Sequence, residues 1–129
     1  MSNVPSELRY TAEHEWVSIV NDTTIRFGIT DYAQDALGDI VFVSLPEVGA
    51  QLTSGDSCGE VESTKSVSDI YAPVSGTVSQ RNNGVETAPE IINSDPYGAG
   101  WIAEVTVVDA NAITTELLDA SAYSALTSG

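Results

Sequence analysis

The residue with the clearest chemical potential in this 129-residue chain is its only lysine, Lys65. It lies in the stretch VESTKSVSDIYAPVSG, with acidic residues at Glu60, Glu62 and Asp69 around it. A lysine amine can form a Schiff base with a carbonyl compound, but that chemistry needs a lowered lysine pKa, and neighbouring carboxylates favour the ammonium. Covalent modification of Lys65 is therefore the better interpretation, with an ordinary solvated side chain as the alternative.

Two other groups with chemical potential are the sole histidine, His14, and the sole cysteine, Cys58. One cysteine cannot form an intramolecular disulfide or a cysteine-rich zinc site, and no zinc-type spacing accompanies the histidine. We expect a structural or surface role for His14 and a packed, hydrophobic role for Cys58. The sequence thus predicts no metal site and no catalytic residue. An enzyme built on Glu15, His14 and Cys58 stays open; it would need a histidine–thiol hydrogen bond and turnover without Lys65.

The charge of the chain is strongly acidic, with 19 aspartates and glutamates against four lysines and arginines, and a net charge of −15 at pH 7. Such a surface repels nucleic-acid phosphates and anionic lipid headgroups, so we expect no nucleic-acid partner and no membrane role. It favours protein partners with basic patches. The N-terminal sequence MSNVPSELRYT has no secretory signal pattern, and we expect a cytoplasmic protein.

Short runs with a period of two predict the β-strands that position these residues. The runs are EWVSIV, TIRFGI, IVFVSL, GEVES, GTVSQ and WIAEVTV. Trp16 and Trp101 lie in such runs, and we expect both to anchor the core. Turn-forming residues separate the runs, including Asn82-Asn83-Gly84. Many short strands with frequent turns indicate a small barrel or sandwich.

Two segments have helical spacing instead. In TDYAQDALGD, Thr30 or Asp31 can cap a short helix that ends at Gly38. The tail over residues 111–127 predicts one helix with a break near Asp119, or two short helices. No linker divides the chain, so residues 1–129 are predicted to form a single domain.

The surroundings of Lys65 predict a β-hairpin over about residues 57–74. Gly55 and Gly76 lie ten and eleven residues from the lysine, and the small polar residues STKS suit a tip better than a strand interior. Lys65 would then project from the end of a rigid ribbon, where another protein can reach it.

Four blocks of the chain resemble the H proteins of the glycine cleavage system. They are VESTKSVSDIYAPVSG, YTAEHEWV, GITDYAQDALGDIVFVSLPEVG and NSDPYGAGW, which together cover most of residues 10–101. Biotin carriers have methionines beside the modified lysine, where Thr64 and Ser66 stand here, and lipoyl domains of 2-oxoacid dehydrogenases lack three of the blocks. The resemblance implies a mainly β, barrel-sandwich hybrid of the biotinyl/lipoyl type with a short internal helix and a helical C-terminus.

The resemblance also implies a function, that of a cofactor carrier and not of an enzyme. Lipoate would be attached to Lys65 by a lipoate ligase or a lipoyl/octanoyl transferase, giving N6-lipoyllysine on an arm of roughly 14 Å. The arm would take the aminomethyl group of glycine from the pyridoxal-phosphate-dependent glycine decarboxylase (P protein) to the tetrahydrofolate-dependent aminomethyltransferase (T protein). Dihydrolipoyl dehydrogenase (L protein) would then reoxidise it. The alternatives are a lipoyl relay acting outside glycine cleavage and an unmodified structural β module.

Three acidic residues match functional positions of that family. Glu15 and Asp69 are implied to hold the ammonium of the loaded arm in a surface cleft, and Glu62 is implied to take part in recognition during lipoylation. Each could instead be a solvated acid of an acidic surface. Tyr32 departs from relatives that have histidine at its position, which puts an imidazole contact from that position in doubt.

Overall fold

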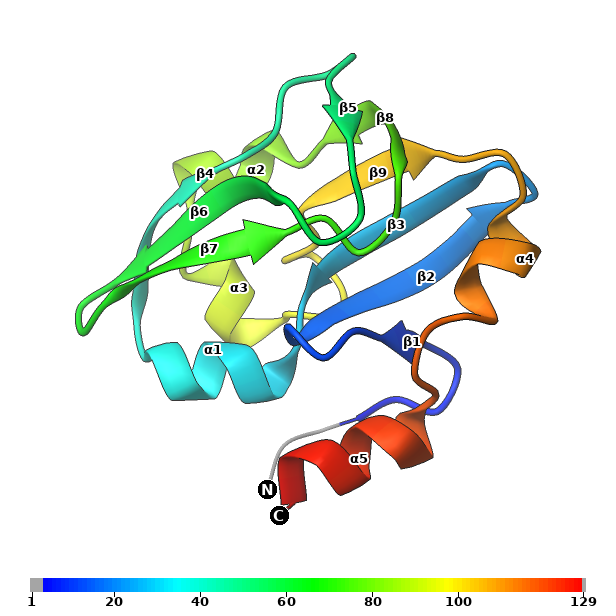
Figure 1. The fold of residues 1–129 in the computed structure, drawn as a ribbon. Coiled ribbons are helices and arrows are strands. Elements are labelled where there is room, and N and C mark those ends of the chain that lie inside the picture. The colour runs from blue at the N-terminus through cyan, green and yellow to red at the C-terminus, as the bar shows by residue number, and fades with distance from the viewer. Residues whose placement is uncertain (1–3, 129) are drawn as a thin grey trace.

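The computed structural model describes residues 4–128, without the side chains of residues 113, 114 and 128, and consists of two antiparallel sheets with short helices around them (Figure 1). Residues 1–3 and 129 of the predicted domain lie outside the described part. The larger sheet has six strands in the order β1-β2-β3-β9-β8-β5, and the smaller has three in the order β4-β6-β7. The strands are β1 Arg9–Tyr10, β2 Glu15–Asn21, β3 Thr24–Ile29, β4 Ile40–Ser44, β5 Gln51–Leu52, β6 Ser57–Ser63, β7 Val67–Tyr71, β8 Gly76–Arg81 and β9 Ala103–Thr106.

The alternating residues of the strands turn one apolar face of each sheet inward. In the larger sheet, Ile25 pairs with Val105 across β3 and β9, and both side chains are fully buried. In the smaller sheet, Val43 pairs with Val61 across β4 and β6, and both are also buried. These residues belong to one hydrophobic cluster, so the core lies between the two sheets. The predicted mainly β, sandwich-like fold is confirmed.

A second hydrophobic cluster joins β1 and β2 to the C-terminal segment. It consists of Leu8, Tyr10, Trp16 and Tyr123. Trp16 lies across its strand partner Gly28, where a built Cβ would come within 2.8 Å of the indole Nε1. Position 28 therefore has no room for a side chain, and the indole N–H donates a 2.9 Å hydrogen bond to the Pro96 carbonyl. The expectation that Trp16 anchors the core is confirmed.

The helices are α1 Asp31–Leu37, α2 Asn83–Thr87, α3 Ile91–Ser94, α4 Ala110–Thr114 and α5 Ala120–Ser128. The predicted internal helix is α1; the Thr30 side chain caps it by accepting the Ala33 N–H, and it ends at Gly38, whose φ of 86° favours glycine. The predicted C-terminal helical segment is two helices, α4 and α5. Among residues 4–128, no helix is long and apolar enough to cross a membrane.

One local prediction was wrong, and another holds in part. Asn82-Asn83-Gly84 is not a simple turn, because the Asn82 side chain accepts the Gly84 N–H and begins α2. Trp101 precedes β9 and packs half-buried against the second cluster, so it borders the core, and the Arg26 guanidinium lies 4.5 Å from the centre of its ring. A cation over an aromatic ring suits the edge of a core, where the charge keeps contact with water.

Candidate functional site

Lys65 lies in a tight turn between β6 and β7, at the end of a hairpin that extends past α1 (Figure 1). The Ser63 N–H donates to the Ser66 carbonyl at 2.8 Å, which closes the turn around Thr64 and Lys65. The Ser63 hydroxyl oxygen also accepts the N–H groups of Lys65 at 3.2 Å and Ser66 at 3.1 Å. The side chain of Lys65 is exposed while its backbone is held firmly. The strands of this hairpin span 57–71, within the predicted range of about 57–74.

The loop between α1 and β4 supports this tip from one side. The Thr64 N–H donates to the Asp39 carbonyl at 3.0 Å, and a Cβ built on Gly38 would lie 2.9 Å from Lys65 Cε. Asn93 of α3 holds the same loop, because its amide donates to the Gly38 carbonyl at 2.9 Å and accepts the Ile40 N–H at 2.8 Å. The position of Lys65 therefore depends on a helix that is distant in the sequence.

A cleft of about 220 Å³ lies beside the hairpin and contains two of the predicted site residues, Glu15 and Asp69. Its walls come from the turn before β2, from β2 and β3, from α1, and from β6 and β7. The lining residues are Glu13, His14, Glu15, Ile29, Tyr32, Ala33, Ala36, Leu37, Val61, Ser68, Asp69 and Ile70. The cleft thus has apolar walls and a few polar groups, which suits an alkyl arm that ends in a polar group.

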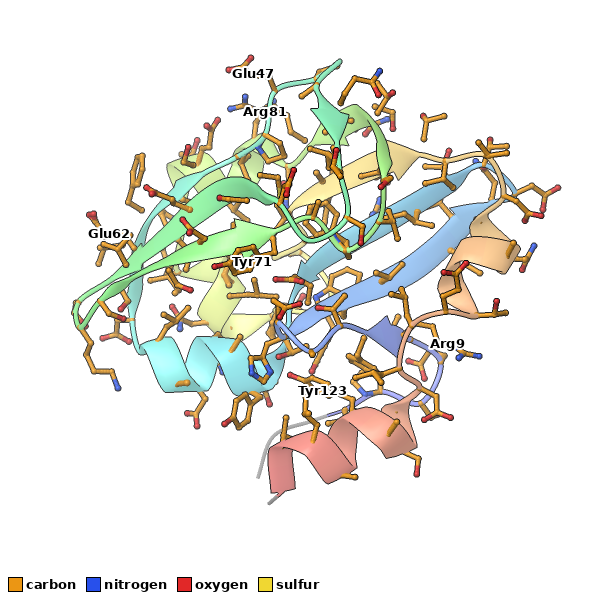
Figure 2. All side chains as sticks on the ribbon, in the orientation of Figure 1. Arg9, Glu47, Glu62, Tyr71, Arg81 and Tyr123 are labelled. Carbon is orange, nitrogen blue, oxygen red and sulfur yellow. The ribbon has the colours of Figure 1, made fainter. Side chains whose placement is uncertain are left out.

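The Glu15 carboxyl is the most unusual group in this cleft. The Thr11 hydroxyl donates to Glu15 Oε1 at 2.6 Å, and the Tyr71 N–H approaches Oε2 at 3.4 Å, so the carboxyl spans the gap between β2 and β7. Figure 2 labels Tyr71 at the end of β7. Glu15 is 2% exposed. This burial disfavours the carboxylate and raises the pKa of Glu15 to about 8, although the two hydrogen bonds oppose the change.

His14 also lines the cleft, which the sequence did not predict. Its Nδ1 lies 2.7 Å from the Tyr123 hydroxyl, which is 2.8 Å from the Thr30 hydroxyl, so α5 and the cap of α1 meet at this ring. The backbone of His14 has a φ of 71°, and its ring centre lies 4.7 Å from that of Tyr32. Burial lowers the pKa of His14. The bond to Tyr123 agrees with the structural role expected for His14. The imidazole in this cleft comes from position 14, and position 32 contributes a tyrosine.

The geometry required by the enzyme alternative is missing from the described residues. They contain no hydrogen bond between His14 and Cys58, and Nδ1 of His14 faces Tyr123. Burial raises the pKa of the Cys58 thiol to about 12, which keeps it protonated and unreactive. Cys58 packs half-buried against the main core, close to its expected role. Within residues 4–128, no group of three or more His, Cys, Asp or Glu side chains is placed to bind a metal ion.

Glu62, the remaining predicted site residue, lies away from the cleft. It pairs with Phe42 of β4 on one side and Val67 of β7 on the other, on the solvent-facing side of the smaller sheet. Figure 2 shows Glu62 pointing outward from the strands near the hairpin loop. Glu15 and Asp69 therefore both line the cleft, and Glu62 does not.

A larger surface hollow of about 470 Å³ lies over β1, β2 and α4, and its lining includes Glu7 and Arg9. None of the predicted site residues reaches it. We assign the candidate site to the smaller cleft because that cleft adjoins the hairpin and contains the buried carboxyl.

Sequence reasoning missed three residues that position the site, which are Ser63, Asn93 and Tyr123. Ser63 could have been found from the rule that serine hydroxyls bond nearby backbone groups in turns. Asn93 stands in a quoted motif, but nothing local shows that its partners are Gly38 and Ile40. The contact of Tyr123 with His14 spans 109 residues, and no sequence signal marks it.

Comparisons with known proteins agree on one family. The model of the family described as "Glycine cleavage H-protein" matches residues 8–129. A glycine cleavage system H protein from Mycobacterium avium (strain 104) is 65% identical over 126 residues, with 95% of this chain and 96% of the relative covered. The H protein from Mycobacterium tuberculosis (strain H37Rv) is 57% identical over 129 residues, with the same shares covered.

A solved structure has the same fold as the chain. The crystal structure of a glycine cleavage system H protein from Mycobacterium marinum superposes with a TM-score of 0.88 at 45% sequence identity. The match covers 98% of this chain and 100% of that one, so the arrangement of both sheets and the helices is shared.

Proposed function

We propose a specific role for Lys65 from one premise: the chain belongs to the glycine cleavage H-protein family. The chain is accordingly a lipoyl carrier of the glycine cleavage system. Lys65 is the residue that carries lipoate, through an amide on its ε-amino group. One observation supports this assignment above all others: the only lysine of the sequence lies exposed at the end of a rigid hairpin.

The surroundings of Lys65 fit such an attachment. The Ser63 hydroxyl and the Asp39 carbonyl hold the turn, so an attached arm starts from a defined position. When bound, lipoate would supply a cyclic disulfide for the uptake of an aminomethyl group. The apolar walls of the neighbouring cleft suit the alkyl part of the arm, and its carboxyls suit a cationic end.

In this role Glu15 and Asp69 receive the ammonium of the loaded arm. Because burial holds the pKa of Glu15 near 8, its carboxyl is mostly protonated at neutral pH while no cation is near. An ammonium beside it favours the carboxylate, so loading the cleft releases a proton from Glu15. Asp69 is exposed at the cleft edge, where it would meet the cation first.

The carrier acts as a substrate of other enzymes and not as a catalyst. Its partners in this proposal are the glycine decarboxylase, the aminomethyltransferase and the dihydrolipoyl dehydrogenase, together with a lipoate ligase or a lipoyl/octanoyl transferase. Residues 1–129 act as a single domain. Support comes from β2, which gives Trp16 to one hydrophobic cluster and Val17 to the other. The cytoplasmic location stays a prediction from the sequence.

The test is an intact-mass measurement of the protein made in a host that supplies lipoate, with the Lys65→Arg variant made alongside. We expect one lipoyl increment on the parent and none on the variant. An unmodified parent, in a host that lipoylates a control domain, would contradict the assignment. The modified parent should then support glycine–CO2 exchange with a glycine decarboxylase, and a modified parent without exchange would favour the lipoyl relay.

A further inference from the structure

The solvent-facing side of the smaller sheet has apolar side chains close to the lysine. Phe42, Glu62 and Val67 are neighbours across β4, β6 and β7, and cross-strand neighbours point to the same face. Phe42 is 53% exposed and Val67 is 58% exposed. Two large apolar side chains thus flank one acidic residue in the row nearest the Lys65 turn that pairs all three strands.

A β-bulge adds a third apolar residue to this face. Ile40 pairs with Ser63 and Phe42 pairs with Glu62, so β4 uses two residues where β6 uses one, and Val41 is the extra residue. Val41 is 53% exposed. Bulges redirect side chains at sheet edges, and this bulge leaves consecutive apolar residues in water. Contiguous exposed apolar side chains are typical of surfaces that contact another molecule.

The same face is acidic around its apolar centre. The next row along the sheet pairs Glu60 with Asp69, and both are exposed. With Glu62, this gives three acidic residues beside the apolar ones. Lys65 is the only lysine of the chain, so no other lysine offsets their negative charge. A complementary partner therefore has an apolar contact bordered by basic side chains.

We infer that Val41, Phe42, Glu62 and Val67 form the docking surface for the enzyme that attaches lipoate to Lys65. This inference rests on the proposed modification of Lys65. The modifying enzyme joins the Lys65 nitrogen to the acyl carbon of an activated lipoyl donor, the nitrogen loses a proton, and the activating group leaves with its bonding electrons. The docking surface holds the hairpin while that bond forms.

Reach distinguishes this enzyme from the partners that act later. An extended lysine places its nitrogen about 6 Å from its Cα, so an enzyme that acts on that nitrogen must cover the rows next to the turn. The later partners act on the sulfur atoms, at the end of an arm of roughly 14 Å, and can do so without touching the hairpin. The surface nearest the lysine therefore belongs to the modifying enzyme.

The experiment measures lipoylation of the apo protein by a lipoate–protein ligase with ATP and lipoate. The Phe42→Thr/Val67→Thr variant places β-branched threonine, which suits strands, at both positions and removes the apolar contact. Val20→Thr is the matched control, because Val20 is a 47% exposed valine on β2 of the other sheet. We expect kcat/KM to fall by about tenfold or more in the double variant, mainly through KM, and to stay unchanged in the control.

A competition measurement tests the same surface with proteins that cannot themselves be lipoylated. The Lys65→Arg protein should inhibit lipoylation of the parent, and Lys65→Arg combined with Phe42→Thr/Val67→Thr should inhibit it at least about tenfold less. Thermal unfolding shows that each variant is folded.

The outcomes separate this inference from the proposed function. A parent that the ligase cannot modify overturns the proposed function. A modified parent whose double variant is lipoylated equally fast overturns only the docking surface. Equal lipoylation combined with slower glycine–CO2 exchange by the lipoylated double variant also overturns it, because the surface would then belong to the decarboxylase.

Discussion

At the scale of single residues, the site contrasts a free amine with a buried acid. The Lys65 side chain is exposed, and hydrogen bonds of its turn hold its backbone. Glu15 is 2% exposed, and hydrogen bonds to its carboxyl hold the side chain in place. A carboxyl of this kind is stable in the fold mainly as the neutral acid, because burial penalises its charged form. Glu15 therefore couples the stability of the fold to pH and to the charge of whatever occupies the cleft.

The pH dependence of stability tests this view of Glu15. Its pKa rises from an ordinary value of 4.5 to about 8, so the folded chain binds this proton more tightly than the unfolded chain. The stabilisation is fully present below the unfolded pKa and is lost as the pH rises through about 8. Glu15→Gln keeps a neutral side chain of the same shape. Relative to this variant, we expect the parent to lose on the order of 3 kcal/mol of unfolding free energy between about pH 5 and about pH 9.

Urea unfolding of both proteins at each pH gives the comparison, and titrations common to both cancel in the difference. Parallel stability curves across this range would mean that Glu15 ionises freely, contrary to the burial seen in the structure.

At the scale of elements, the sequence predicted the strands and the helix whose apolar residues recur with a clear period. The six alternating runs correspond to β2, β3, β4, β6, β8 and β9, and the capped segment at Thr30 is α1. Strands β1 and β5 have two residues each, which is too short for any period, and α3 has four. The cleft itself depends on packing between elements far apart in the chain, and local patterns do not encode such contacts.

Helix α5 shows what the sequence could not predict. Tyr123 stacks on Tyr10 with ring centres 4.7 Å apart, and its hydroxyl bonds His14 and Thr30. Through these contacts the C-terminal helix supports one wall of the cleft, and Figure 2 shows Tyr123 pointing from α5 toward the body of the protein.

Replacing the hydroxyl of Tyr123 tests this support. Tyr123→Phe keeps the aromatic stack on Tyr10 and removes two hydrogen bonds at a buried position, so we expect a loss of about 1–2 kcal/mol in unfolding free energy. The matched control is Tyr32→Phe in the same cleft, where no hydrogen bond of the hydroxyl is described, with an expected change under about 0.5 kcal/mol. Urea unfolding measures both. Equal losses would show that the Tyr123 hydroxyl bonds do not stabilise the helix.

At the scale of the whole molecule, charge is the dominant property. The net charge is −15, and an amide at Lys65 would remove one positive charge and make it −16. Attraction to basic partners then acts over the whole surface, and salt screens it over a Debye length of about 10 Å at 0.1 M ionic strength.

Salt titration tests this long-range contribution. We expect the Kd for the glycine decarboxylase to rise and the association rate to fall as KCl increases. The reason is that salt screens the attraction between the acidic chain and a basic surface of the enzyme. Isothermal titration or surface-binding kinetics across ionic strength provides the measurement, with a neutral sugar at equal osmolality as the control. A Kd that stays constant over this range would mean that recognition depends on local contacts alone.

The smaller sheet also has a consequence for the behaviour of the protein in concentrated solution. Its strand order leaves β4 and β7 at the edges of the sheet, and unpaired backbone groups of an edge strand can pair with another molecule. A second copy that approached β7 would bring its Asp69 toward the Asp69 of the first. Like charges would then meet across the contact, so the surplus of acid opposes association through this edge. Near the isoelectric point of about 4.1 that protection disappears, and the first aggregates should form through these edges.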